Sequence, residues 1–251
     1  MDLGLSGKAC LVSGSTAGIG LETARLLVAE GSRVVTCGRR GGPGIGETAH
    51  VQVDLARRGG PERAVSDAVA ALGGLDVLVN NAGVARQARF EEVADDEWDA
   101  YWHLNVMSYV RAIRAALSHL RANRGAIVNV SSTAGKRPST GMPHYSVTKA
   151  AVLSLSRLVA DLYGQDGIRC NAVTPGPTAT EAWLGEGGGL ADQQAGSRED
   201  VLARVAAGRP LGRLARAEEI AAVVVFLCSE RSSYVTGAAW SADGGTVPII
   251  V

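Results

Sequence analysis

Short apolar runs alternate with longer stretches of helical periodicity along most of the chain. The short runs are rich in Val, Ile and Leu and are apolar at successive positions, which is typical of strands covered on both faces of a parallel sheet. They predict strands at residues 8–13, 33–37, 50–54, 75–79, 125–130, 168–173 and 238–241. The longer stretches predict helices at residues 19–30, 61–72, 103–123, 144–163 and 217–229.

This alternation of strand and helix determines the expected fold class. Strands that are each followed by a helix pair in parallel, and the helices then cover both faces of the sheet. We therefore expect an α/β protein with a single doubly wound domain of the Rossmann type, in which about seven parallel strands form one sheet. The chain has 251 residues, which is long enough for one such core, and residues 1–251 are expected to form one domain.

Two segments interrupt the alternation. Residues 38–46 are rich in glycine and connect two predicted strands without a helix. Residues 175–214 form a connection of about forty residues, and loops of that length in compact domains are usually functional. Within it, Ser197 and Asp200 have the spacing of a capping box and predict a short helix that ends near Ala207.

The composition argues against several classes of protein. Hydrophobic residues make up 46% of the chain, which is too many for a disordered protein. Lys and Arg balance Asp and Glu at 25 each, without a basic block, so a nucleic-acid or membrane-surface protein is not expected. No apolar run approaches the ~18 residues of a membrane span, and the first residues lack the basic region and apolar stretch of a signal peptide.

The four cysteines lie far apart, without a CxxC motif and without clustered histidines. This spacing argues against a disulfide framework and against a metal site, and it favours reduced, buried thiols. We therefore expect a cytoplasmic globular protein without a metal cofactor.

A glycine-rich turn follows the first predicted strand. Gly14, Gly18 and Gly20 stand between that strand and the first helix, where they permit a tight turn and the close approach of a pyrophosphate. The helix N-terminus supplies free N–H groups and the positive end of its dipole. The spacing differs from the standard G-x-G-x-x-G fingerprint, and an ordinary turn is the alternative in a chain with 32 glycines. The strand before the turn and the helix after it favour a dinucleotide site.

The end of the second predicted strand bears on the choice of cofactor. Dinucleotide-binding proteins of this topology usually place an acidic residue about twenty positions after the glycine turn, where it binds the ribose hydroxyls. Here Arg39 and Arg40 stand at that place. A guanidinium can bind a 2′-phosphate through two hydrogen bonds, so the sequence favours NADP(H), with NAD(H) as the alternative. Two solvated loop arginines are the competing interpretation.

A tyrosine and a lysine four residues apart form the second candidate group. Tyr145 and Lys149 lie within the predicted helix at 144–163, so the phenol and the ammonium share one helix face. A phenol has a pKa of about 10 in water and is a poor base at neutral pH unless a nearby cation stabilises the phenolate. An ordinary pair on a helix surface is the alternative.

Taken together, these residues resemble the short-chain dehydrogenase/reductase family from Lys8 to Gly245, in the family's order and spacing. The motifs that carry the resemblance are the glycine turn, Asp54-Leu55, Asn80-Asn81-Ala82-Gly83, Asn105, Ser132, Tyr145 with Lys149, Pro175-Gly176 and Asp243-Gly244-Gly245. Residues 210–221 and the Asp243-Gly244-Gly245 end also resemble the branch that contains 3-oxoacyl-acyl-carrier-protein reductases.

The resemblance implies catalytic roles for four residues. Tyr145 would be the general acid/base, and Lys149 would stabilise its phenolate form and hold the nicotinamide ribose. Ser132, rather than its neighbour Ser131, would hydrogen-bond the substrate oxygen. Asn105 would hold a water that links Lys149 to solvent.

The resemblance also implies which residues bind the dinucleotide. The positions around its phosphates correspond to Gly14, Ser15, Thr16, Gly18, Ile19 and Gly20, with Arg39 at the 2′-phosphate. The positions around its adenine and adenine ribose correspond to Asp54, Leu55, Asn81, Ala82 and Gly83. The positions around its nicotinamide correspond to Tyr145, Lys149, Pro175, Gly176, Thr178 and Thr180.

We therefore expect an NADP(H)-dependent oxidoreductase that transfers a hydride between the nicotinamide and a ketone or secondary alcohol, with a 3-oxoacyl thioester among the candidate substrates. An NAD-dependent secondary-alcohol dehydrogenase is the first alternative. A sensor or scaffold that binds the dinucleotide without turnover is an alternative of another class. Members of the family are commonly tetramers, so the resemblance implies a homo-oligomer, either a tetramer or a dimer.

The substrate is expected between Ser132, Tyr145 and the loop at residues 177–214. This loop carries Trp183, Leu184 and Leu190, which offer apolar contact, and it shows no evident anion clamp. Further candidates for the rim of the pocket, with free surface arginines as the alternative, are Arg86, Arg89, Arg137 and His144.

Overall fold

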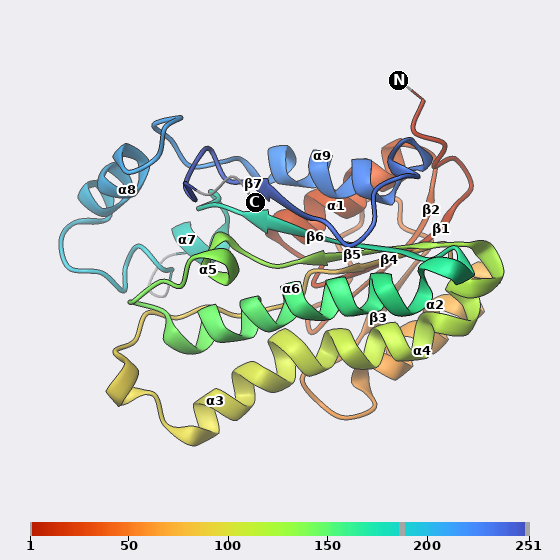
Figure 1. The fold of residues 1–251 in the computed structure, drawn as a ribbon, viewed down its shortest axis with the longest axis horizontal. Helices are drawn as coiled ribbons and strands as arrows, with labels where there is room; N and C mark the ends of the chain where they lie inside the picture. Colours follow the sequence, from red (N-terminus) through yellow and green to blue (C-terminus); the bar gives the residue numbers. More distant parts are fainter. Residues whose placement is uncertain (1, 186–188, 249–251) are drawn as a thin grey trace.

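The computed structural model describes residues 2–185 and 189–248. Seven strands form one sheet in the order β3-β2-β1-β4-β5-β6-β7, and every pairing is parallel (Figure 1). The strands are β1 (Ala9–Ser13), β2 (Arg33–Gly38), β3 (Ala49–Gln52), β4 (Val77–Asn80), β5 (Ala126–Val130), β6 (Arg169–Pro175) and β7 (Ala239–Ala242). The predicted fold class is confirmed.

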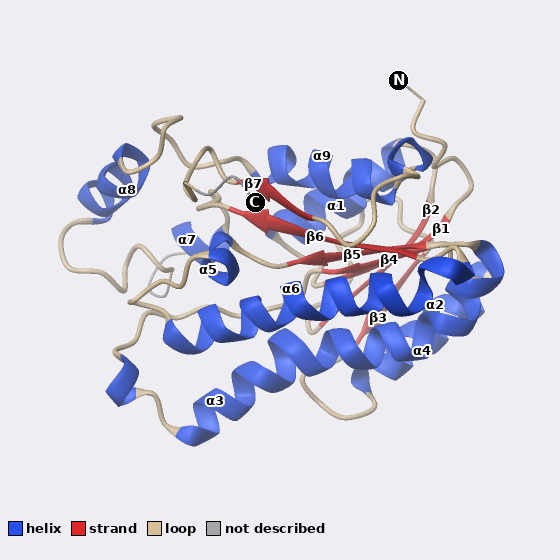
Figure 2. Ribbon diagram, in the orientation of Figure 1, coloured by secondary structure: helices blue, strands red, loops and turns tan. Residues whose placement is uncertain are grey.

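Helices cover both faces of this sheet (Figure 2). The α-helices of the described residues are α1 (Gly18–Ala29), α2 (Gly60–Leu72), α3 (Asp95–Trp102), α4 (Ser108–Asn123), α5 (Thr133–Lys136), α6 (Pro143–Tyr163), α7 (Glu181–Leu184), α8 (Arg198–Ala207) and α9 (Ala217–Cys228). Helices α1 and α9 lie on one face, and α2, α4 and α6 lie on the other (Figures 1 and 2). No helix within the described residues is long and apolar enough to cross a membrane.

The core is divided by the sheet into two apolar clusters. Leu78 and Ile127 pack with residues of α2, α4 and α6, whereas Val79 and Val128, the next residues along the same strands, pack with residues of α1 and α9. All four side chains are completely buried. Successive strand residues point to opposite faces, so both faces must be apolar. This is why the strands were predictable as continuous apolar runs.

A chain of buried polar side chains crosses one half of the core. Asn80 on β4 donates a hydrogen bond to Oδ1 of Asn129 on β5 at 2.9 Å. Asn129 donates to Oγ of Ser156 on α6 at 2.9 Å, and Ser156 donates to the carbonyl of Val152 one turn earlier at 2.7 Å. Because buried polar groups need partners, this chain fixes α6 at one position on the sheet. The same helix carries Tyr145 and Lys149.

The helix predicted at 103–123 differs from the observed one in its start and its regularity. The helical segment begins at Asp95, and residues His103–Met107 form a π-helical turn between α3 and α4. Three acidic residues in the first turn, Asp95, Asp96 and Glu97, interact favourably with the dipole at the N-terminus of α3. Their polarity conceals the helix from a search for apolar periodicity.

Short elements account for the other differences. Helices α5 and α7 have four residues each, too few to show a helical period in the sequence. Helix α8 follows the predicted cap, because Oγ of Ser197 accepts a hydrogen bond from the amide of Asp200 at 3.1 Å. Strand β6 extends through Pro175, where we expected it to break. Residues 186–188 of the predicted substrate loop lie outside the described residues.

The buried polar chain can be tested with Ser156→Ala. This substitution leaves the side-chain amide of Asn129 with only the weak acceptor Sγ of Cys170, at 3.6 Å. We expect a loss of about 1–3 kcal/mol in the free energy of unfolding, measured in urea, because a buried donor loses its good partner. Ser154→Ala, an exposed serine on the same helix, should change it by less than about 0.5 kcal/mol. Equal effects of the two substitutions would contradict the role given to Ser156.

Candidate functional site

A cavity of about 900 Å³ lies at the carboxyl edge of the sheet. The strand order reverses between β1 and β4, and open parallel sheets bind ligands outside the strand ends at such a point. Most of the predicted site residues line this cavity, namely Gly14, Thr16, Gly18, Ile19, Arg39, Asp54, Leu55, Asn81, Ala82, Gly83, Ser132, Tyr145, Lys149, Pro175, Gly176, Thr178 and Thr180. Ser15, Gly20 and Asn105 are the predicted residues that are not among its lining residues.

The glycine turn brings backbone rather than side chains to the cavity. Gly14 and Gly18 have positive φ angles of 62° and 56°, which side chains disfavour. A Cβ at Gly20 would lie 2.4 Å from the carbonyl oxygen of Gly14, so only glycine fits there. The N-cap residue of α1, Ala17, provides no side-chain cap, and the first turn holds no acidic residue. The N–H groups at this helix end are therefore suited to an anion.

Two predicted site residues hold this turn in place. Ser15 is completely buried; its hydroxyl donates to the carbonyl of Val12 at 2.8 Å and accepts from the amide of Cys37 at 3.1 Å. The side-chain amide of Asn81 donates to the carbonyl of Gly14 at 3.0 Å. The side chains of Ser15 and Asn81 thus bind the protein's own backbone and shape the turn.

The two arginines after β2 are in different situations. The guanidinium of Arg40 donates two hydrogen bonds of 3.0 Å each to the carboxylate of Glu181 on α7. Arg39 is exposed at the cavity wall, and within the described part of the chain its guanidinium forms no ion pair. Of the two, Arg39 is therefore the one whose guanidinium is available to an anionic ligand.

Tyr145 and Lys149 lie on one face of α6, near its N-terminus. Lys149 is only 3% exposed; its ammonium donates to the carbonyl of Val130 at 2.9 Å and lies 5.7 Å from the centre of the Tyr145 ring. Burial lowers the pKa of Lys149 to about 7, because an ammonium loses its hydration inside the protein. Burial raises the pKa of Tyr145, and a hydrogen bond with the Ser132 side chain opposes this rise.

The structure distinguishes the two neighbouring serines after β5. Ser131 donates its hydroxyl to the carbonyl of Lys149 at 2.8 Å, which ties the end of β5 to α6. Ser132 is the N-cap of α5, and its Oγ accepts from the amide of Ala134 at 3.1 Å. The hydrogen bond with Tyr145 places the Ser132 hydroxyl beside the phenol. Ser132 is thus the serine that accompanies Tyr145, as the family spacing implied.

Asn105 lies behind the cavity, in the π-helical turn. Its Oδ1 accepts from the amide of Val84 at 3.0 Å, and its Nδ2 donates to the carbonyl of Val84 and to Oγ1 of Thr148, both at 3.1 Å. The π turn therefore positions Asn105 to join the segment after β4 to α6. π turns inside helices occur frequently at functional sites.

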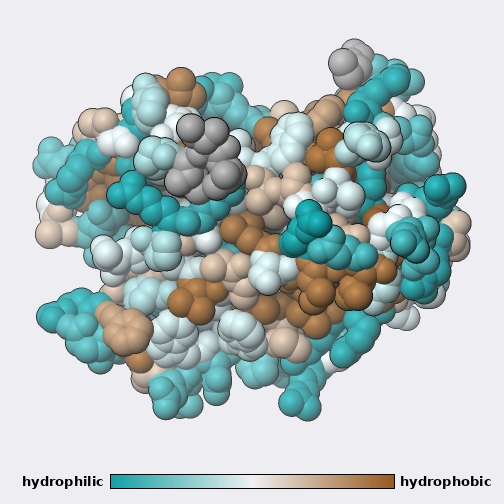
Figure 3. Space-filling view, viewed as in Figure 1, coloured by the Kyte–Doolittle hydropathy of each residue, from teal (hydrophilic) through white to brown (hydrophobic). Residues whose placement is uncertain are grey.

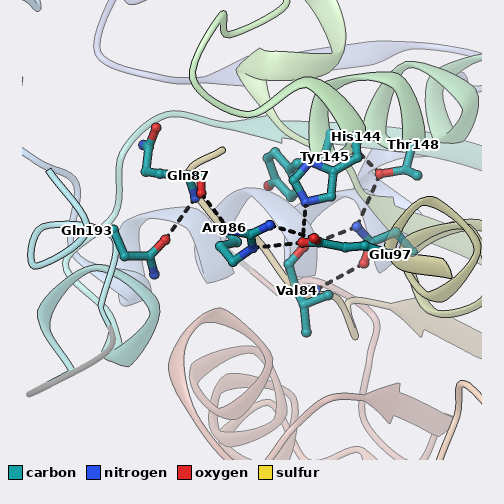
Figure 4. A network of polar contacts seen from close by, with 9 residues as sticks. Val84, Arg86, Gln87, Glu97, His144, Tyr145, Thr148 and Gln193 are labelled. Atoms are coloured by element: carbon teal, nitrogen blue, oxygen red, sulfur yellow. Dashed lines mark hydrogen bonds and ion pairs between the residues drawn. The ribbon is translucent and has the colours of Figure 1, made fainter. Parts of the chain in front are cut away.

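A further polar network, which the sequence did not reveal, lies beside Tyr145 (Figure 4). Glu97 on α3 accepts hydrogen bonds of 2.7 and 2.5 Å from Arg86, and its Oε1 lies 3.2 Å from Nε2 of His144. Burial lowers the pKa of His144, and the Glu97 carboxylate opposes this. Arg86 also donates to the carbonyl of Gln87 at 3.2 Å, and the amide of Gln87 donates to the side chain of Gln193 in the 177–214 loop at 2.8 Å.

This network corrects part of the prediction for the pocket rim. His144 is completely buried, with its ring centre 3.9 Å from that of Tyr101, so it lies behind Tyr145 and not at the rim. Arg86 and Arg89 are paired with Glu97 and Glu91. Of the four predicted rim residues, only Arg137 lines the cavity. Within the described residues there is no group of three or more His, Cys, Asp or Glu side chains arranged to hold a metal ion.

Known proteins are similar to this chain along most of its length. A family model described as Enoyl-(Acyl carrier protein) reductase matches residues 14–247. The uncharacterized oxidoreductase YvrD of Bacillus subtilis is 36% identical over 262 residues, which cover 98% of this chain and 99% of that protein. The cis-4-hydroxycyclohexanecarboxylate dehydrogenase of Sinomonas cyclohexanicum is 38% identical over 258 residues, which cover 95% of this chain and 96% of that protein.

A solved structure is also similar over the full length. The L-sorbose reductase of Gluconobacter frateurii, in complex with NADPH and L-sorbose, superposes with a TM-score of 0.92 at 35% identity. The superposition covers 100% of both chains.

The burial of Lys149 leads to a prediction about pH. Its folded-state pKa is about 7, whereas a lysine in an unfolded chain has a pKa of about 10.4. Between these pH values the unfolded chain binds more protons than the folded protein does, so the free energy of unfolding rises with pH. The destabilisation caused by Lys149 is therefore at its full size below about pH 7 and decreases as the pH rises. We expect Lys149→Met to raise the free energy of unfolding at pH 6 by up to about 5 kcal/mol, and the gain to shrink toward pH 10.

Urea unfolding of both proteins at pH 6, 8 and 9.5 measures this difference. Lys136→Met serves as the control, because Lys136 is only half-buried and its ammonium donates to the carbonyl of Ala239 and the hydroxyl of Ser241. The control difference should stay nearly constant with pH. A Lys149→Met difference that is also constant would contradict the buried, poorly hydrated ammonium.

Proposed function

The chain belongs to the short-chain dehydrogenase/reductase family, oxidoreductases that act on hydroxyl and carbonyl groups with NAD(P)(H), and on this basis we propose that it is an NADP(H)-dependent enzyme that interconverts a ketone and a secondary alcohol. The observation that carries the proposal is the placement of Tyr145, Lys149 and Ser132 at one wall of the cavity. A proton donor, a cation and a second hydroxyl there surround the space where a carbonyl oxygen would lie.

The cavity fits a nicotinamide dinucleotide. The uncapped N-terminus of α1 offers N–H groups to a pyrophosphate. Asp54 and Leu55 would hold the adenine end, whereas Thr178 and Thr180 would hold the nicotinamide end. When bound, the dinucleotide supplies the hydride in reduction and accepts it in oxidation.

Tyr145 performs the proton transfer in this mechanism. As hydride reaches the carbonyl carbon, the phenol gives its proton to the carbonyl oxygen, which becomes the alcohol hydroxyl. Ser132 donates a hydrogen bond to that oxygen and stabilises its developing charge. The ammonium of Lys149 stabilises the phenolate left behind, and in the oxidative direction the phenolate accepts the proton from the alcohol.

The surroundings of Asn105 support its predicted role with a water molecule. A Cβ at Gly83 would lie 3.1 Å from Oδ1 of Asn105 and 3.4 Å from Nζ of Lys149. Glycine therefore lets both polar atoms approach the same stretch of backbone at the cavity, where a side chain would crowd them. We propose that a water there returns protons to Lys149.

Arg39 supports NADP(H) as the preferred dinucleotide. It is the unpaired arginine after β2, and a 2′-phosphate would give its guanidinium an anionic partner. The L-sorbose reductase, which shares the fold, was solved with NADPH. NAD(H) remains the alternative cofactor.

The proposed substrates are ketones and secondary alcohols of modest size. The similar proteins act on L-sorbose and on cis-4-hydroxycyclohexanecarboxylate, so ketoses and cyclic alcohols are the first candidates. A 3-oxoacyl thioester stays a prediction; the description of the family model also names an acyl carrier protein, but with an enoyl rather than a 3-oxo group. A sensor or scaffold function without turnover is the competing proposal, which the intact set of Tyr145, Lys149 and Ser132 does not favour.

We also propose that the protein forms a homo-oligomer through α4 and α6. Val147, Leu158 and Leu162 on α6 are 50–58% exposed, and apolar side chains gather over this helix (Figure 3). Apolar surface of this kind is typical of a protein interface. A cytoplasmic location stays a prediction, supported by four unpaired, buried cysteines.

Loss of the phenol tests the proposed chemistry. We expect Tyr145→Phe to lower kcat/KM for ketone reduction by about a hundred- to ten-thousand-fold, because the proton donor is removed. The dissociation constant of the dinucleotide should change little, since the ring remains. Tyr163→Phe, at the other end of α6, is the matched control. Unchanged turnover in Tyr145→Phe, or no turnover of any carbonyl by the wild type, would contradict the proposal.

The cofactor preference is tested by titrating the protein with NADPH and NADH. We expect NADPH to bind at least about tenfold more tightly, a difference of about 1.4 kcal/mol, and Arg39→Ala to remove the difference. Arg40→Ala is the matched control and should keep the preference, because Arg40 is held by Glu181. Equal or tighter binding of NADH by the wild type would instead favour the NAD-dependent alternative.

A further inference from the structure

Arg209 lies in the 177–214 loop and lines the cavity. It follows α8, and its backbone is fixed on both sides: its amide donates to the carbonyl of Ala206 at 3.1 Å, and its carbonyl accepts from the amide of Gly212 at 2.9 Å. The amide of Leu211 then donates to the carbonyl of Gly244 beyond β7, at 3.2 Å. The side chain of Arg209 lines the cavity that also contains Tyr145 and Ser132.

The guanidinium of Arg209 lacks an anionic partner. One Nη donates to the carbonyl of Val205, in the helix before it. Its Nε is buried and has no hydrogen-bond partner in the described part of the chain. The Arg209 guanidinium also forms no ion pair with any of these described residues. Other arginines of this loop are neutralised, Arg198 by Asp192 and Arg213 by Glu219. Burial lowers the pKa of Arg209, so its charge is held at an energetic cost.

The charges around the cavity are distributed unequally. Asp54 and Glu181 are the carboxylates among the described lining residues. Asp54 lies after β3, where its Oδ1 accepts from the amide of Ala56, and Glu181 is bound by Arg40. Arg137 is the residue that follows α5. It lines the cavity and forms no ion pair within the described residues. Arg209 and Arg137 are therefore cavity-lining cations without a carboxylate partner among the described residues.

Apolar side chains line the same cavity as Arg209. Trp183, Leu190 and Val205 line the same cavity, and Trp183 and Val205 also belong to the small apolar cluster of this loop. A compact apolar body fits these walls, and an apolar setting strengthens an ion pair with a guanidinium because water competes less.

We propose that Arg209 binds a carboxylate of the substrate at the end remote from the reacting carbon. The substrate class is then a small oxo acid, or the matching hydroxy acid, with an apolar aliphatic or alicyclic body. This inference rests on the proposed function, since it names the substrate class of the same site. It departs from the expectation for the loop, in which the sequence showed no evident anion clamp.

Two ketones that differ only in charge test the proposal in turnover. The probes are 4-oxocyclohexanecarboxylate and the uncharged 4-oxocyclohexanecarboxamide. We expect the wild type to reduce the acid with a kcat/KM at least tenfold above that for the amide. Arg209→Gln should remove this preference by raising KM for the acid, and Arg209→Lys should restore part of it. Arg204→Gln, on α8 and outside the cavity lining, is the matched control and should keep the preference.

Calorimetric titration separates this proposal from the proposed function, because it needs no turnover. We expect cyclohexanecarboxylate to bind the wild type at least tenfold more tightly than cyclohexanecarboxamide, and Arg209→Gln to abolish the difference. Selective binding of the acid through Arg209, without reduction of either ketone, would support the anion site and overturn the proposed function. No binding of the acid, equal binding of acid and amide, or equal weakening of both by Arg209→Gln would overturn the anion site.

Discussion

The parallel arrangement of the strands determines where everything else lies. In this sheet all seven carboxyl ends point to one edge, so the segments that leave β1, β2, β3, β4, β5 and β6 meet there and enclose one cavity. Residues as distant in sequence as Gly18 and Thr180 become neighbours through this constraint. Two apolar clusters, one on each face, hold the sheet rigid beneath them. The candidate site is thus formed by the segments that follow the strands, together with the N-terminal part of α6, on a scaffold that the two clusters stabilise.

The ammonium of Lys149 is the costly element of this arrangement. It lies in the interior with the carbonyl of Val130 as its hydrogen-bond partner, and burial disfavours its charge. The surrounding protein is built to keep it there, because Ser131 binds the carbonyl of Lys149 and Ser156 anchors the same helix to β5. Active sites commonly carry such destabilising groups, and the apolar core of the sheet compensates for them.

Sequence reasoning predicted the strands, and it singled out Tyr145 and Lys149 as a candidate pair, because both depend on local patterns. A strand buried on both faces is apolar throughout, and Tyr145 with Lys149 has a fixed helical spacing. It could not predict which side chains form hydrogen bonds with the protein's own backbone instead of with a ligand. Ser15 is such a residue, and its partners depend on the path of the turn. Nor could it connect Glu97 with His144, which are 47 positions apart in the chain. Among the described residues Arg209 differs from Arg198 and Arg213 in lacking a carboxylate neighbour, and from the exposed Arg204 in its partial burial at the cavity. Neighbours and burial are both set by the fold.

The π-helical turn at His103–Met107 has a consequence for how α3 and α4 can be used together. A π turn contains one residue more than an α turn, and each residue of a helix advances the side chains by about 100°. The side chains of α4 are therefore rotated about the helix axis by roughly 100° from the positions they would have if α3 continued without the π turn. Tyr101 and Glu97 reach His144 on one side of the turn, while Ile113 and Ala116 on the other side enter the core. In an uninterrupted helix, either the contacts with His144 or the core contacts of α4 would form, and the other group of side chains would point away. Insertion or deletion of even one residue in this segment would therefore disrupt one of the two groups of contacts.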